Sequence, residues 1–165
     1  MNESYKELIV KKEMGAKEIV LRTVCVVPTV LFALLSLAGV LIALVGAGIF
    51  GVLTYFVWIS TDIEYEYLYL DKELNVDKIM AKSRRKKVAT LEVERMEIMA
   101  PEKSHQLDSY RNRDFKKVDY SAGKDLPEMK LYTIYYDGSQ KIQVNLTEDF
   151  VKTIKAIAPR KVFLD

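Results

Sequence analysis

Charged residues are missing from one long stretch of this sequence. No Asp, Glu, Lys, Arg or His occurs at positions 23–61, a run of 39 residues. As one helix this run would extend about 58 Å, whereas the hydrocarbon core of a bilayer is about 30 Å thick and needs about 20 residues. The run therefore predicts two membrane-spanning helices, at residues 19–38 and 41–60, joined by a short turn.

Two other classes of segment fit this run poorly. A helix pair in a soluble protein keeps a polar face toward water, and no such face exists here. A cleaved signal peptide has an apolar region of about 7–15 residues, but this run is much longer and follows 22 mostly polar residues. We therefore interpret residues 16–61 as a transmembrane helical hairpin.

Cysteine and histidine are nearly absent. The lone cysteine, Cys25, can form no internal disulfide, in agreement with a reducing compartment. The lone histidine, His105, has no second histidine or cysteine to share a metal or to form a nucleophile–base pair. "SAGKD" at 121–125 lacks the first glycine of a phosphate loop and reads as a turn. We expect no metal, no cofactor, no catalytic residue and no enzyme activity.

Charge distribution predicts the orientation of the hairpin. Lys and Arg flank both ends of the uncharged run, and such residues stay on the cytoplasmic side. We therefore expect a multi-pass protein of the cell membrane with both termini in the cytoplasm. Tyr55 and Trp58, at the inner end of the second span, are typical of an aromatic belt at the membrane interface. The net charge of +2 argues against nucleic acid as a partner.

The N-terminal segment, residues 1–15, predicts an amphipathic helix. Ser4 and Glu7 have the spacing of a capping box, and Gly15 is a natural helix end. Two interpretations remain open: a helix that lies in the membrane interface, or a short helix that packs on the soluble part of the chain.

Residues 62–165 predict a cytoplasmic β-rich domain of about six strands. Period-two alternation with aromatic side chains marks the strands, and Asp137-Gly138 is a strong hairpin turn. Residues 147–158 form an amphipathic helix that Thr147 caps. The remainder of 102–128 reads as a loop that is either functional or mobile. The expected strands are 63–70, 74–79, 88–101, 114–120 and the two arms of a hairpin at 129–146.

This order of elements resembles pleckstrin-homology-like domains, in which antiparallel strands form a curved sheet and one helix closes it. "EYEYLYLDKELNVDKI", "RRKK", "EIMAP" and "PRKVF", with the two-span hairpin, are similar to a family of short membrane proteins of Gram-positive anaerobes. The resemblance implies an α+β membrane protein with a C-terminal capping helix. That family has no assigned activity, so the resemblance implies no site residue.

A basic segment follows the second span. Lys82, Arg84, Arg85, Lys86 and Lys87 lie within six positions. Near an inner leaflet each such residue gains about 1 kcal/mol from anionic lipid, and in pleckstrin-homology-like folds a loop between early strands often binds anionic head groups. The alternative is a solvated hairpin tip that only obeys the positive-inside rule.

These features favour a membrane-anchored, non-enzymatic interaction module that binds anionic lipid or a protein partner at the inner leaflet. The alternative is an accessory subunit of a larger membrane complex, or a homo-oligomer, that acts through its spans. Small residues at Gly39, Ala43, Ala47 and Gly51 allow close helix contact, either within the hairpin or between chains. An enzyme that uses residues 102–128 is a third interpretation without a catalytic constellation to support it.

Overall fold

The computed structural model describes residues 5–165 and divides into two compact units. The β unit contains the described residues up to Lys12, together with Glu64–Ile79 and Arg85–Asp165. The helical unit contains Glu13–Ile63 and the short segment Met80–Arg84.

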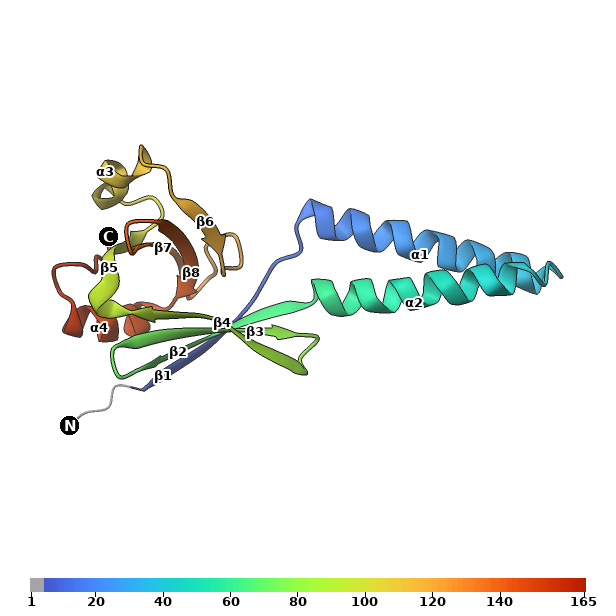
Figure 1. The fold of residues 1–165 in the computed structure, drawn as a ribbon, viewed down its shortest axis with the longest axis horizontal. Coiled ribbons are helices and arrows are strands. Elements are labelled where there is room, and N and C mark those ends of the chain that lie inside the picture. The colour runs from blue at the N-terminus through green and yellow to red at the C-terminus, as the bar shows by residue number, and fades with distance from the viewer. Residues whose placement is uncertain (1–4) are drawn as a thin grey trace. The chain divides into compact units, whose positions relative to one another are not determined.

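The helical unit is a hairpin of two apolar helices, α1 (Ala16–Leu37) and α2 (Ala43–Thr61), which lie side by side in Figure 1. At 1.5 Å per residue they extend about 33 Å and about 29 Å, and both are long and apolar enough to cross a membrane. The chain reverses at residues 38–42, where Gly39 has a φ of 94°, a value that favours glycine. Two helices with a break near Gly39 are thus confirmed.

Polar, aromatic and small side chains lie in the contact between α1 and α2. The hydroxyl groups of Thr29 and Thr54 are 3.0 Å apart and share a hydrogen bond. The rings of Phe32 and Phe50 stack with their centroids 5.6 Å apart. Within this unit Ala43 is buried, so part of the predicted small-residue stripe is used inside the hairpin rather than on its outer surface.

The prediction of an N-terminal helix at residues 1–15 is wrong. Residues Lys6–Lys11 form a strand, β1, and Ser4 of the predicted capping box lies outside the described residues. The reason is tertiary: β1 pairs antiparallel with β2, and Val10 on one face is buried while the neighbouring Lys11 is exposed. A local capping signal is weaker than a full ladder of strand hydrogen bonds.

The first sheet has the order β1-β2-β3-β4, and the helical hairpin is inserted between its first two strands. A two-residue turn joins β2 to β3 and a three-residue turn joins β3 to β4. Asp71, Lys72, Ala81 and Lys82 in these turns all have positive φ, as the central residues of type I′ turns require. The β-rich domain predicted for residues 62–165 therefore lacks β1, which belongs to the same sheet. The remaining strands are β2 (Ile63–Leu70), β3 (Glu73–Met80) and β4 (Arg84–Glu92).

The second sheet has the order β5-β7-β8-β6. The predicted Asp137-Gly138 turn is confirmed between β7 and β8, which pair antiparallel. The single strand predicted for 88–101 is divided by a 3₁₀ turn at Val93–Arg95, after which the chain enters this second sheet. Its strands are β5 (Met96–Pro101), β6 (Lys116–Asp119), β7 (Lys130–Tyr136) and β8 (Gln140–Leu146).

The segment between β5 and β6, predicted as a loop, packs onto the second sheet. It contains a 3₁₀ turn at His105–Leu107 and the short helix α3 (Asp108–Arg111). The rings of Tyr110 and Phe115 lie 4.8 Å and 4.7 Å from the ring of Tyr135. These aromatic contacts give the segment a fixed place without regular strands.

The C-terminal helix α4 (Glu148–Ile157) closes the β unit. Thr147 caps it as predicted, because its hydroxyl oxygen accepts a hydrogen bond from the amide of Phe150. Phe150, Val151 and Ile154 are buried, and the ring of Phe150 lies 6.3 Å from that of Tyr69 on β2. Ile157, the last residue of this helix, is exposed.

Two buried tyrosines on β2 differ in how their hydroxyl groups are satisfied. The Tyr67 hydroxyl donates to the carbonyl of Tyr120 and accepts from the amide of Asn145. The Tyr69 hydroxyl is buried without a hydrogen-bond partner among the described residues. Burial raises the pKa of both phenols.

Gly46→Leu should destabilise the helical hairpin by about 1–3 kcal/mol, because a Cβ at position 46 would lie 2.9 Å from the ring of Phe32. Gly48→Leu is the matched control, since a Cβ there meets no atom within 4 Å. Thermal unfolding of the full chain in detergent, followed by circular dichroism, measures the difference. Equal melting of the two variants would contradict this packing.

Tyr67→Phe should lower the free energy of unfolding by about 1–3 kcal/mol, because it leaves a buried amide and carbonyl without their partner. Tyr69→Phe removes a hydroxyl that bonds nothing in the described residues, so it should be neutral or stabilising. Chemical denaturation of both variants tests this pair. A Tyr69→Phe cost as large as that of Tyr67→Phe would show that the assignment is wrong.

Candidate functional site

The basic segment, Lys82–Lys87, occupies a turn and the start of a strand. The prediction that the whole run forms the connection is wrong: the turn is Ala81–Ser83, and Arg84 to Lys87 begin β4. β4 is the last strand in the order of the first sheet. Charged side chains are common on edge strands because they oppose pairing with other chains, which reconciles four consecutive basic residues with a strand.

Four of the five predicted binding residues carry exposed side chains without an ion pair within residues 5–165: Lys82, Arg84, Lys86 and Lys87. The fifth, Arg85, differs. Its guanidinium donates a hydrogen bond of 2.8 Å to Glu66 on β2, whose side chain is 5% exposed. Arg85 thus forms an ion pair with a buried carboxylate, which the sequence did not reveal.

Glu66 lies in an acidic environment on the first sheet. Burial raises the pKa of its carboxyl, the Arg85 charge lowers it, and Glu7 and Asp77 raise it again. Arg85 is the only cation among these groups, so it offsets the burial of Glu66. We infer that Arg85 is less available to an external anion than its neighbours are.

The turn of the basic segment is anchored at the end of α2. Within the helical unit, the amide of Ala81 donates a 2.9 Å hydrogen bond to the carbonyl of Asp62, the residue that follows α2. Lys82 and Arg84 belong to the same unit. The structure therefore places these two basic residues beside the end of an apolar helix.

The aromatic residues predicted for the membrane interface lie in the last turns of α2. Tyr55 and Trp58 are both largely exposed. The guanidinium of Arg22 lies 4.6 Å from the ring centroid of Trp58, and its Nε donates to the hydroxyl of Thr61. A cation over an indole ring gains about 0.5–1 kcal/mol at an exposed site, so this contact joins the first helix to the last turn of the second.

His105 lies exposed in the 3₁₀ turn after β5, with its Nδ1 3.5 Å from an oxygen of Asp108. Within residues 5–165, no group of three His, Cys, Asp or Glu side chains comes close enough to hold a metal ion. Cys25 is buried in α1.

Sequence reasoning missed one concave site in the β unit. A cavity opens beside Glu102, and the "SAGKD" segment, interpreted as a turn, supplies part of its wall. Its three lysines, Lys103, Lys124 and Lys130, are separated by 21 and 6 positions. No local spacing could indicate this site, because only the packing of the second sheet brings the three together.

Comparison with known proteins supports the architecture. A family model described as a bacterial PH-like domain (DUF6106) matches residues 2–164. No curated protein and no solved structure showed a match. The two sheets, the closing helix α4 and this match over almost the whole chain agree with one another. The chain therefore belongs to the bacterial PH-like domain family DUF6106.

Proposed function

We propose that this protein is a membrane-anchored, non-enzymatic interaction module in which α1 and α2 span the cell membrane and the basic segment binds anionic lipid at the cytoplasmic leaflet. The observation that carries the proposal is the hydrogen bond between Ala81 and Asp62, which holds the basic turn at the end of α2. The end of a spanning helix lies at the head-group level, so Lys82 and Arg84 would lie where anionic lipid is found.

The strand pairing supports a common side for both flanks of the hairpin. Lys11, at the end of β1, pairs with Glu64, at the start of β2, so the chain must leave and re-enter the sheet at the same end of these two strands. Two spans satisfy this requirement and one span does not. The basic residues of both flanks then favour the cytoplasmic side, with both termini inside.

Electrostatic attraction sets an order among the basic residues. It decays over about 8–10 Å at physiological salt, while a strand advances about 3.3 Å per residue. Lys82 and Arg84, nearest to the end of α2 by chain position, should contribute most, and Lys87 should contribute least. Arg85 should contribute little, because Glu66 holds it.

The alternative, an accessory subunit that acts through its spans, has less support. The small residue Ala43 is buried inside the hairpin, and a side chain at Gly46 would collide with Phe32. The outer surface of the helices carries mainly exposed Leu, Ile and Val, which suit lipid as well as protein.

The membrane topology can be tested with single cysteines in a Cys25→Ser background. In intact cells a membrane-impermeant maleimide should label Leu41→Cys, in the turn between the helices. It should reach Ser109→Cys, in α3, only after permeabilisation, because this residue would lie on the cytoplasmic side. Labelling of both positions in intact cells would contradict the proposed orientation.

Lipid binding can be tested on the full chain in nanodiscs. A fluorophore sensitive to its environment, attached at Ser83→Cys in the basic turn, should report a less polar setting in anionic than in neutral lipid. Raised salt should weaken the response. Replacing Lys82, Arg84, Lys86 and Lys87 by Gln should abolish it, since each contributes about 1 kcal/mol.

Three controls make this test specific. Replacing Lys116, Lys117, Lys155 and Arg160 by Gln removes the same number of positive charges from other parts of the chain. This variant should leave the signal of the fluorophore at position 83 unchanged. A label at Ser109 should not respond to lipid charge. Arg85→Gln should reduce the response less than Arg84→Gln does. An equal response in neutral and anionic nanodiscs would contradict the proposal of lipid binding and would favour a protein partner.

A further inference from the structure

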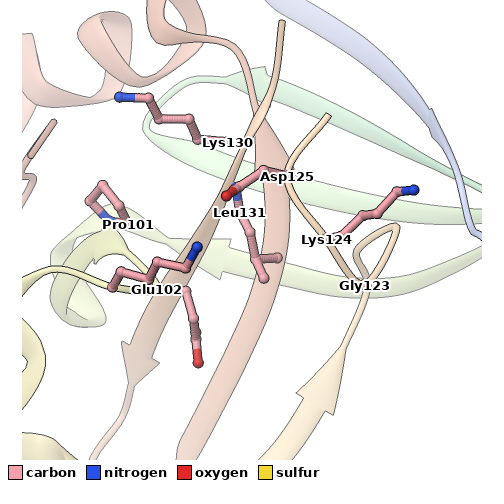
Figure 2. Close-up of a pocket in the computed structure, with 8 residues that line it drawn as sticks. Pro101, Glu102, Gly123, Lys124, Asp125, Lys130 and Leu131 are labelled. Carbon is pink, nitrogen blue, oxygen red and sulfur yellow. The ribbon is translucent and has the colours of Figure 1, made fainter. Parts of the chain in front are cut away.

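The cavity in the β unit is large enough for a small organic ligand. Its volume is about 580 Å³, within the range of about 300–1,000 Å³ that is usual for small-molecule sites. It opens between the end of β5, the loop before β7 and the start of β7, as Figure 2 shows. Its lining consists of Pro101, Glu102, Lys103, Gly123, Lys124, Asp125, Lys130 and Leu131.

A fully buried asparagine on β8 holds one wall of the cavity. The Asn145 side chain is inaccessible to solvent, accepts a hydrogen bond from the amide of Ala122 and donates one to the carbonyl of Lys124, both of 2.8 Å. A buried amide with both ends bonded fixes the backbone that it spans. The wall around Gly123, whose φ is 90°, is therefore formed before any ligand arrives.

A second part of the lining is also fixed by hydrogen bonds. The carboxylate of Asp125 accepts from the amide of Leu131 at 2.8 Å, and the amide of Glu102 donates to the carbonyl of Leu131 at 2.9 Å. These bonds tie the loop, the end of β5 and the start of β7 together. A cavity with two such walls needs little ordering when it binds a ligand.

The charge of Glu102 is already balanced within the protein. Burial acts to raise the pKa of its carboxyl, but hydrogen bonds from Thr133, Lys141 and Gln143 together hold that pKa below its ordinary value. The Lys141 ammonium lies 3.0 Å from one carboxylate oxygen. Glu102 therefore stays ionised and neutralises Lys141 rather than the lysines of the cavity.

Lys103 and Lys130 supply positive charge to the cavity. Within residues 5–165 neither ammonium group forms an ion pair, although Glu148 lies within electrostatic reach of Lys130. The same two lysines line an adjoining cavity of about 380 Å³ with His105 and Asp165. Two lysines that line the same preformed cavity give it a positive charge that suits a doubly charged anion.

We propose that this cavity binds a phosphate monoester of a small polyol. The phosphate group would lie at Lys103 and Lys130, and the hydroxylated body would extend past Asp125 toward Lys124, which Figure 2 shows on the far side of Asp125 from Lys130. A carboxylate accepts hydrogen bonds from hydroxyl groups but repels phosphate, so Asp125 sets the orientation of the ligand.

The residues that line this cavity are not part of the basic segment, so the proposal goes beyond the proposed function and does not rest on it. The basic segment offers exposed cations on an edge strand, which suit a charged surface. The cavity offers few cations around a fixed hollow, which suit one small molecule.

Isothermal titration of the full chain in nanodiscs of neutral lipid tests the proposal, with glycerol 3-phosphate, inorganic phosphate and glycerol as probes. Glycerol 3-phosphate should bind saturably, inorganic phosphate more weakly, and glycerol not measurably. The double variant Lys103→Gln/Lys130→Gln should weaken binding of glycerol 3-phosphate by about tenfold or more per lysine, the value of one charge-assisted hydrogen bond.

The matched control is Lys86→Gln/Lys87→Gln, which removes the same charge from the basic segment and should bind glycerol 3-phosphate like the unchanged protein. Equal weakening by both double variants, or no saturable binding of glycerol 3-phosphate, would overturn the proposal. The two proposals can fail independently. Binding of glycerol 3-phosphate without a response to anionic lipid would support only the cavity, and the reverse result would support only the proposed function.

A second arm distinguishes a free ligand from a lipid head group of the same chemistry. Phosphatidic acid, whose head group is also a phosphate monoester of glycerol, is added to the nanodiscs. If it abolishes binding of soluble glycerol 3-phosphate in the Lys86→Gln/Lys87→Gln variant, the head group occupies the cavity. If binding is unchanged, the source is a soluble phosphate ester. Either result supports the site and identifies its source.

Discussion

The pairing of β1 with β2 is the constraint on which the rest of the structure depends. Lys6 to Lys11 and Glu64 to Tyr69 are adjacent strands although the whole helical hairpin separates them in the sequence. Whatever lies between them must return the chain to the end of the sheet at which it left β1. A hairpin of two helices with 22 and 19 residues does this, because nearly equal antiparallel lengths bring the ends back together.

The same pairing explains why the β unit cannot be separated from the helices by a single cut. A fragment that begins at residue 62 would lack β1 and expose the edge of β2, where Leu8 and Val10 face Tyr67 and Tyr65 across the ladder. An unpaired strand edge invites association with other chains. The functional unit is therefore the full chain, and both proposals are tested on it.

The two proposed basic sites would depend on different physical effects. The basic segment would gain from long-range attraction to a charged surface, which salt screens within about 10 Å. The lysines of the cavity would act at hydrogen-bond distance, beside walls that Asn145 and Asp125 hold in place. Arg85 illustrates the difference between charge and availability: it is part of the basic run, but the buried carboxylate of Glu66 occupies it.

The sequence by itself determined the features that depend on local composition and period. The uncharged run predicted two helices, Asp137-Gly138 predicted the hairpin turn, and Thr147 predicted the start of the last helix. Tertiary structure alone decided the strand at Lys6–Lys11, the Arg85–Glu66 pair and the cavity at Lys103 and Lys130. The physical reason is range, since these features arise from contacts between residues distant in the chain, which no local pattern encodes.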